Sequence, residues 1–269
     1  MGKTVQKAAL VLSGGGALGT AHLGAIQSFE RAGIAFDFYA GVSAGAIVCA
    51  ALACGKTADE IMNDVKETNL LKLAFDLTRS SFGIVRGESV KKILDDAFEG
   101  KRFEDLDVPL YIGATDFSSG ERVNISKGKL SDAVRASVSV PILFEPFYHE
   151  SEGRWLIDGG VVQNFPIDTA MEKYKGKKII GVDIAGSFQK DMNFDKKKFF
   201  GKSKDLAAVG QRIVRIMFKS QQEHFPPDDR VLIIRPSLDD FTALDILKLE
   251  AIAERGREAA LQALENSSD

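Results

Sequence analysis

A serine between two glycines is the first feature of this sequence that could do chemistry. Gly41-Val42-Ser43-Ala44-Gly45 fits the G-x-S-x-G pattern, in which a sharp turn between a strand and a helix presents the serine hydroxyl clear of the sheet. The apolar residues 36–40 before it read as a strand, and the small residues 44–54 after it read as a helix. The start of that helix would bring free N–H groups and partial positive charge to Ser43. The G-x-S-x-G pattern also occurs by chance. The interpretation of Ser43 as a nucleophile therefore depends on the strand predicted before it and the helix predicted after it.

A second glycine-rich turn, at residues 13–19, follows the apolar run 8–12. It lacks the G-K-[ST] ending of a phosphate-binding P-loop, but its spacing fits G-x-G-x-x-G, so a dinucleotide site is an alternative. That alternative needs an acid at the end of the next strand, whereas Asp37 opens that strand. We therefore favour an oxyanion hole, in which main-chain N–H groups approach a tetrahedral oxyanion. The candidate donors are Gly14, Gly15, Gly16 and Ala17.

A serine hydroxyl becomes a good nucleophile only when a neighbouring base takes its proton. Two histidines lie downstream, His149 in a turn that we expect to be solvated and His224 at an expected helix end, and neither follows a strand. Asp158 directly follows the apolar residues 155–157, and burial would raise its pKa toward neutrality. Two alternatives stay open: Asp158 is an ordinary turn aspartate before glycine, or Asp183 is the base.

The composition is that of an ordinary globular protein, with 269 residues, 45% hydrophobic and 27% charged, and a net charge of −3. We expect a single domain spanning 1–269, because no linker divides the chain. The charge gives no reason to expect nucleic acid as a partner. No apolar run approaches the 18 or so residues of a membrane-spanning helix, and no signal peptide is visible, so a cytoplasmic protein is the default expectation.

No cofactor or metal site is expected from the sequence. Cys49 and Cys54 lie five apart on one predicted helix, so they face different sides and suit neither a disulfide nor a metal pair. The three histidines show no metal-ligand spacing. The oligomeric state is left open.

Strands alternate with helices along the chain, and the strands are apolar throughout rather than alternating. This pattern predicts an α/β fold, a three-layer sandwich with a mostly parallel central sheet flanked by helices. Ligands in such folds bind at the carboxyl ends of the strands, where both glycine turns and Asp158 are expected. The predicted strands are 8–12, 36–40, 109–117, 121–126, 155–157, 178–184 and 230–235. The predicted helices are 19–32, 44–54, 88–98, 130–138 and a closing helix at 242–264, and a further helix starts at the capping box 57–60.

Taken together, the motifs resemble those of the patatin-like phospholipases. The match consists of the glycines 14–16, the serine turn 41–45 and Asp158-Gly159-Gly160, with further family blocks at 136–144 and 158–166. These blocks run from about residue 8 to 185, and their joint order is more specific than any one of them. One departure is Leu18, where the family usually has Arg or Lys, which puts in doubt a charge role at that position but not the main-chain donors.

The resemblance implies a Ser43–Asp158 dyad without histidine, an acyl-enzyme on Ser43, and hydrolysis of lipid acyl esters. The expected substrates are fatty acyl esters of phospholipids or lysophospholipids, and the apolar bend that holds Pro141 and Phe144 could shape the acyl pocket. Two alternatives stay open. An acyltransferase usually has His just before the serine, where this chain has Val42, and a non-catalytic lipid-binding or regulatory protein would not need the whole set of residues.

Two apolar or basic segments have less certain roles. Residues 70–87 are rich in apolar side chains and could form a lid, or could pack as an ordinary part of the domain. Within 186–269, residues 190–219 combine an excess of Lys and Arg with interleaved Phe, which suits an anionic lipid surface. A solvated loop followed by an ordinary core-facing helix is the alternative. The first interpretation predicts peripheral contact with the inner surface of a membrane.

Overall fold

The computed structural model describes residues 6–68, 87–185, 227–243 and 245–266, together with Ile213, Ile216, Met217, Ser220 and Gln221. The predicted lid at 70–87, apart from Gly87, and most of the basic stretch 190–219 therefore lie outside the described residues. The helices are α1 (Thr20–Arg31), α2 (Ala44–Ala53), α3 (Ala58–Glu67), α5 (Glu88–Phe98), α6 (Leu130–Ser137), α7 (Ile167–Lys173) and α9 (Leu249–Asn266). None of these described helices is long and apolar enough to cross a membrane.

The described strands form one eight-stranded sheet in the order β5-β6-β3-β2-β1-β7-β8, with β4 paired to β3. Their bounds are β1 (Gln6–Leu12), β2 (Ile34–Val42), β3 (Leu110–Asp116), β4 (Arg122–Ile125), β5 (Phe147–His149), β6 (Arg154–Asp158), β7 (Ile179–Val182) and β8 (Val231–Ile234). The five strands from β3 to β8 in this order are parallel, whereas β4, β5 and β6 are antiparallel to their neighbours. The predicted α/β sheet between helices is confirmed, and "mostly parallel" holds for this central part.

The register of the sheet brings the two glycine turns to one edge. Leu12, the last residue of β1, is level with Gly41 of β2, and Val42 is level with Gly113 of β3. On the far side of β3, Ala114 is level with Asp158 of β6. Ser43 and Asp158 therefore follow or end strands at the same level of the sheet, on either side of β3.

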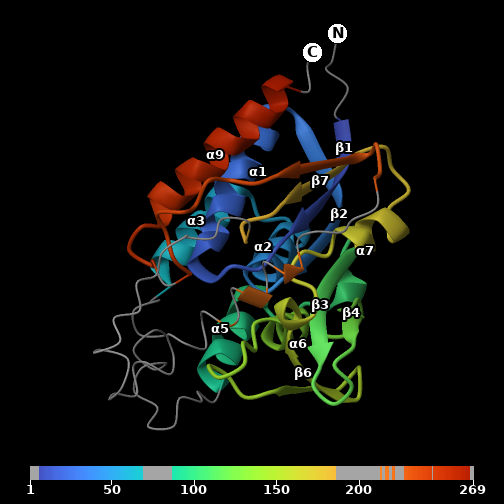
Figure 1. The fold of residues 1–269 in the computed structure, drawn as a ribbon. Helices are drawn as coiled ribbons and strands as arrows, with labels where there is room; N and C mark the ends of the chain where they lie inside the picture. The colour runs from blue at the N-terminus through green and yellow to red at the C-terminus, as the bar shows by residue number, and fades with distance from the viewer. Residues whose placement is uncertain are drawn as a thin grey trace.

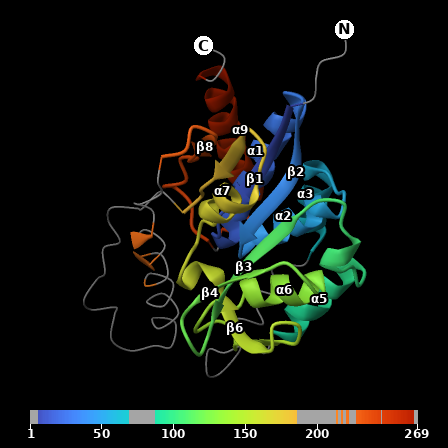
Figure 2. The same cartoon turned by 90° about the vertical axis from the view of Figure 1, so that its right-hand side faces the viewer.

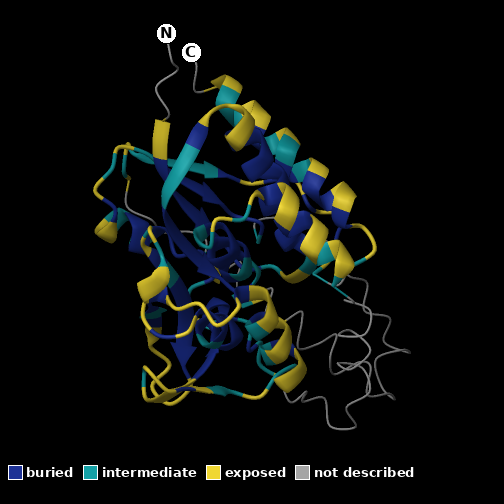
Figure 3. Cartoon of the chain, turned by 180° about the vertical axis from the view of Figure 1, so that it is seen from behind, coloured by how far each residue is buried: buried dark blue, intermediate teal, exposed yellow. Residues whose placement is uncertain are grey.

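Helices cover both faces of the sheet (Figures 1 and 2). The larger hydrophobic core lies on the face that carries α1, α2, α3, α5, α6 and α9, and it takes in Ala8, Leu10 and Leu12 of β1. The smaller core takes in Ala9 and Val11 and is covered by α7. These five residues are fully buried, because a central parallel strand is covered on both faces. Figure 3 shows the same pattern, with a buried sheet and helices exposed along their outer faces.

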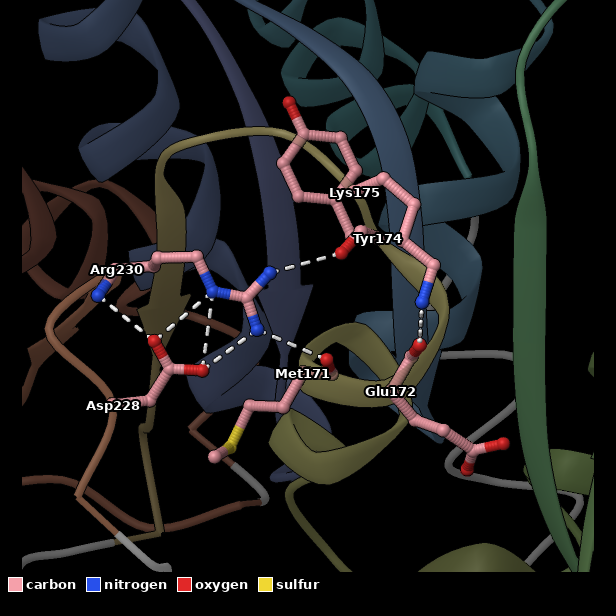
Figure 4. A network of polar contacts seen from close by, with 6 residues as sticks. All are labelled: Met171, Glu172, Tyr174, Lys175, Asp228 and Arg230. Carbon is pink, nitrogen blue, oxygen red and sulfur yellow. Dashed lines mark hydrogen bonds and ion pairs between the residues drawn. The ribbon is translucent and has the colours of Figure 1, made fainter.

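A polar network joins the end of α7 to the start of β8 (Figure 4). The Arg230 guanidinium donates to the main-chain carbonyls of Met171 and Tyr174, both at 3.0 Å, and forms an ion pair with Asp228. These carbonyls belong to the last turn of α7, where the helix itself supplies no donors. Arg230 therefore fixes the end of the helix that follows the Asp158 turn.

The closing helix begins later than predicted. α9 starts at Leu249 rather than at residue 242, because Asp245 forms hydrogen-bonded turns with Thr242 and with Lys248. Leu247, which a helix from 242 would direct inward, is 83% exposed. The three-residue strand β5 was also not predicted, since its sequence has no strand pattern of its own and is held by pairing to β6.

The closing helix packs on α1 through two glycines. A Cβ on Gly24 of α1 would collide with the Ala253 carbonyl oxygen, and a Cβ on Gly256 of α9 would collide with the Ala21 carbonyl oxygen. The main chains of the two helices are therefore in direct contact, and no side chain larger than hydrogen fits at either position. This contact fixes α9 against the helix that follows the first glycine turn.

We predict that Gly256→Ala destabilises the fold, although alanine is the better helix former by about 1 kcal/mol. Overpacking at this contact should cost about 1–3 kcal/mol in the free energy of unfolding, measured by urea denaturation. Gln262→Ala introduces the same residue on the exposed side of α9 and should change stability little. Equal effects of the two substitutions would contradict the close contact.

Candidate active site

Ser43 sits in a strained turn between β2 and α2. Its backbone has φ 52° and ψ −119°, a conformation that non-glycine residues rarely adopt. The flanking glycines make the turn possible: a Cβ on Gly41 would lie 2.5 Å from the Gly45 carbonyl oxygen, and a Cβ on Gly45 would collide with the Leu12 carbonyl. Strain held by its surroundings is common at catalytic residues, and here it turns Ser43 out at the carboxyl end of β2.

The first glycine turn lies directly beside Ser43. A Cβ on Gly14 would be 3.0 Å from the Ser43 Cβ atom, so only glycine allows this approach. Two of the four candidate oxyanion donors are already engaged, since the Gly14 N–H donates to the Asn164 carbonyl at 3.1 Å and the Ala17 N–H donates to the Ala243 carbonyl at 2.9 Å. The N–H groups of Gly15 and Gly16 donate to no group in the described part of the chain. These two donors are available to a ligand.

Asp158 ends β6 as a buried carboxyl with one free oxygen. Its side chain is 2% exposed, and Oδ1 accepts the Gly160 N–H at 2.7 Å. Among the described residues, Oδ2 has no hydrogen-bond partner. Burial raises the pKa of Asp158 to about 7, against the opposing effects of the Gly160 N–H and the nearby Ser43 hydroxyl. The carboxyl is therefore able both to take and to return a proton near neutral pH.

The end of α6 holds both of these residues by their main chains. The Ser43 N–H donates to Ser137 Oγ at 2.8 Å, and Ser137 Oγ donates to the Gly113 carbonyl at 2.6 Å. The Asp158 N–H donates to the Ser139 carbonyl at 3.0 Å. Sequence reasoning assigned no role to Ser137 or Ser139, although both lie in the block at 136–144 that carried part of the family resemblance.

A buried arginine fixes this segment. Arg135 is 2% exposed; its Nη1 donates to Ser139 Oγ at 2.5 Å and its Nε donates to the Gly87 carbonyl at 3.1 Å. Its guanidinium carbon lies 5.3 Å from the Phe144 ring centroid, within cation–π range. Pro141 and Phe144, the predicted pocket residues, are both half-buried on the loop between α6 and β5. Their role in binding an acyl chain stays a prediction.

The alternative bases have other partners. His149 was expected in a solvated turn, which is wrong: its ring is buried, and Nδ1 accepts the Glu152 N–H at 3.2 Å at the end of β5. The polar residues after it misled the prediction, because residues 147–149 form a strand that pairs with β6 and contacts α6. Asp183 forms an ion pair with Arg235 at 3.2 Å. His224 lies outside the described residues.

Leu18 and His22, near the first glycine turn, have structural roles. Leu18, where the family usually has a cation, is buried in the larger core. His22 holds the first glycine turn, because one ring nitrogen lies 2.9 Å from the Ser13 carbonyl, and burial lowers its pKa to about 4. No group of three potential metal ligands occurs in the described parts of the chain. A serine hydroxyl, a buried carboxyl and two main-chain donors without a partner in the described part of the chain are groups that nucleophilic acyl transfer could use.

Comparison with known proteins adds the family. A family model described as patatin-like phospholipase matches residues 10–171. Patatin-like phospholipase domain-containing protein 6 of Mus musculus is 27% identical over 92% of this chain and 20% of its own length. An uncharacterised NTE family protein of Mycobacterium tuberculosis is 28% identical over 97% of this chain and 47% of its own length. The chain thus spans between a fifth and a half of these relatives.

Solved structures agree at the level of the fold. VipD from Legionella pneumophila has a TM-score of 0.62 at 16% identity, covering 98% of this chain and 67% of that one. ExoU in its complex with SpcU from Pseudomonas aeruginosa has a TM-score of 0.56 at 16% identity, covering 96% of this chain and 51% of that one. With the family model matching more than half of its residues, the chain belongs to the patatin-like phospholipase family.

Proposed function

We propose that this protein is a serine acyl hydrolase that cleaves fatty acyl esters of phospholipids or lysophospholipids. Ser43 is the nucleophile, Asp158 is the general base and acid, and the N–H groups of Gly15 and Gly16 form the oxyanion hole. The observation that carries this function is the buried Asp158 carboxyl, with a pKa of about 7 and a free Oδ2, near the Ser43 hydroxyl.

The reaction proceeds in two halves. Ser43 Oγ attacks the ester carbonyl carbon while Asp158 Oδ2 takes the hydroxyl proton, and the carbonyl oxygen becomes an oxyanion bound by Gly15 and Gly16. The tetrahedral intermediate collapses, the C–O bond to the alcohol breaks, and Asp158 returns the proton to the departing oxygen. A water molecule then loses its proton to Asp158 and attacks the acyl carbon. The bond between the acyl carbon and Ser43 Oγ breaks, Asp158 returns the proton to Oγ, and the fatty acid is released.

The lipid substrate rests on family membership. The relatives that the chain matches are named as patatin-like phospholipase domain proteins, so an acyl ester of a phospholipid or lysophospholipid is the substrate class that we propose. Such substrates lie in or near bilayers, and we propose that the protein contacts the membrane surface peripherally. The basic stretch 190–219 would supply that contact, and nearly all of it lies outside the described residues.

Labelling with a fluorophosphonate probe tests the assigned roles. We expect the wild type to be labelled, Ser43→Ala to give no labelling, and Asp158→Asn to slow labelling by roughly 10²–10⁴-fold, the usual contribution of a general base. A double substitution of His149 and His224 by glutamine should still be labelled. Labelling that disappears with the histidines would mean a conventional triad. A wild type that is never labelled, yet binds lipid vesicles, would favour the non-catalytic alternative.

The pKa of Asp158 predicts how hydrolysis depends on pH. Only the ionised carboxylate accepts the Ser43 proton, so kcat/KM should rise with pH and reach half its plateau near pH 7. Stopped-flow or steady-state assays of a soluble ester between pH 5 and 9 would measure this profile. A half-point near the usual aspartate pKa of about 4 would contradict the assignment.

The raised pKa of Asp158 also predicts that the free energy of unfolding falls as pH rises, whereas activity rises. Between about pH 4 and pH 7 the folded state keeps the Asp158 proton that the unfolded chain has lost, so stability falls as pH rises through this range. Asp158→Asn removes this loss and should be more stable than the wild type at pH 8 by roughly a few kcal/mol, but not at pH 4.

Asp116 provides the matched control for this stability measurement. Hydrogen bonds from the Ser118 and Ser119 N–H groups lower the pKa of Asp116. Asp116 therefore stabilises the fold at high pH, whereas Asp158 destabilises it there. Asp116→Asn should be less stable than the wild type at pH 8, and the difference should shrink as pH falls below the ordinary aspartate pKa. Urea denaturation from pH 8 to below the ordinary aspartate pKa would measure the stability of both variants. The same sign of effect in both would contradict a raised pKa at Asp158.

A further inference from the structure

The two free donors of the oxyanion hole belong to peptide groups whose carbonyls are already held. In a trans peptide the C=O and N–H bonds point to opposite sides, so a partner on the carbonyl sets where the N–H points. The Gly14 carbonyl accepts from Asn164 Nδ2 at 3.2 Å, and the Gly15 carbonyl accepts from the Leu18 N–H at 3.3 Å. The N–H groups on the other side of these peptides are those of Gly15 and Gly16.

Asn164 holds Gly14 by both of its main-chain polar groups, and one of these two hydrogen bonds is made to the Gly14–Gly15 peptide. Its side-chain NH₂ donates to the Gly14 carbonyl, and its own carbonyl accepts the Gly14 N–H at 3.1 Å. A carbonyl oxygen only accepts hydrogen bonds, so the NH₂ and not Oδ1 must face the Gly14 carbonyl. The side chain is 2% exposed, which leaves it little freedom to rotate away.

This orientation is unfavourable for the side-chain amide oxygen of Asn164. Asn164 Oδ1 is buried and has no partner among the described residues. A Cβ on Gly14 would lie 2.5 Å from this Oδ1 and 3.0 Å from the Ser43 Cβ, so Asn164 borders the nucleophile itself. An unpaired buried oxygen is unfavourable, and it persists here because the opposite rotamer would set Oδ1 against the Gly14 carbonyl.

Gln221 in turn holds Asn164. Its Oε1 accepts the Asn164 N–H at 2.7 Å, and its Nε2 donates to the carbonyls of Gly160 and Val161, both at 3.0 Å. One side chain therefore binds three main-chain groups of the turn that links Asp158 to Asn164. Gln221 lies beyond residues 10–171, the part of the chain that the family model matches.

We infer that Asn164 is a positioning residue that aims the Gly15 N–H at the oxyanion, and that Gln221 keeps Asn164 in place. This inference rests on the proposed function, since it assigns a role within that oxyanion hole. Without the Asn164 NH₂, the Gly14–Gly15 peptide loses the partner that fixes its plane. Hydrogen bonding at the carbonyl also strengthens the donor at the other end of the same peptide.

The loss should appear in the transition state and not in substrate binding. Deleting one oxyanion donor typically lowers kcat by about 10²–10³-fold. Asn164→Ala misaims a donor without deleting it, so we expect kcat for a soluble p-nitrophenyl ester to fall by about 10–10²-fold with KM unchanged. Gln221→Ala should give a smaller fall in kcat with the same pattern.

A pair of inhibitors separates this role from a general disturbance of the site. A long-chain trifluoromethyl ketone forms a tetrahedral adduct on Ser43 that carries an oxyanion, whereas the corresponding trifluoromethyl alcohol has the same chain and cannot form one. Asn164→Ala should lose affinity for the ketone by the same factor as kcat and keep its affinity for the alcohol. Asn124→Ala is the matched control, because Asn124 lies on β4 and its side chain accepts a hydrogen bond from the Thr169 hydroxyl, at 3.4 Å, and not from the glycine turn.

The possible outcomes separate a failure of the role inferred for Asn164 from a failure of the proposed hydrolase function. Equal losses for the ketone and the alcohol, or no loss for either, would overturn the role of Asn164 while the wild type remained an active hydrolase. If Asn164→Ala does not fold, the ketone-to-alcohol ratio of Gln221→Ala decides in its place. A wild type that neither hydrolyses the ester nor binds the ketone would overturn the proposed function itself.

Discussion

Direct contact between the two glycine turns is the constraint on which the rest of the site depends. A Cβ on Gly45 would collide with the Leu12 carbonyl and lie 2.7 Å from the Ser13 carbonyl, and one on Gly19 would lie 2.8 Å from the Ala44 Cβ. Because nothing larger than hydrogen separates the two turns, the start of α2 lies beside main-chain N–H groups from the turn after β1. Ser43 thereby meets two sources of positive potential, the helix terminus and the glycine donors.

The least favourable local features of the fold gather around this contact. Ser43 is held at positive φ, the Asp158 carboxyl is buried, and Asn164 Oδ1 is buried with no partner in the described part of the chain. Each of these lowers stability by itself, and each would be relieved by an ordinary substitution. Their cost is offset by the buried sheet and by the close packing of α1 on α9.

The parts of this site that sequence reasoning could find are those defined by local chain geometry. A strand, a tight turn and a helix leave a pattern of glycines and apolar residues, so both turns and the strand-end aspartate were predicted. Ser137, Asn164 and Gln221 act through contacts between distant segments, and a serine, asparagine or glutamine in a loop carries no local signal of such a role. The errors have the same origin: His149 is buried because its strand pairs with β6 and contacts α6, and Leu247 is exposed because a turn replaces the first part of the expected helix.

The groups with proposed reactive roles are held mainly through main-chain atoms. Ser137 accepts the Ser43 N–H, Ser139 accepts the Asp158 N–H, and Asn164 binds both polar groups of Gly14. A main-chain anchor fixes a residue whatever its side chain does, so the side chains of Ser43 and Asp158 are free to exchange a proton without giving up the contacts that position them. The anchors come from two separate segments, the end of α6 and the turn after β6, and Gln221 braces the second from beyond the matched part of the chain. The two glycine turns and Asp158 thus supply the proposed reacting atoms, while their alignment also depends on Gln221, which lies outside the motifs.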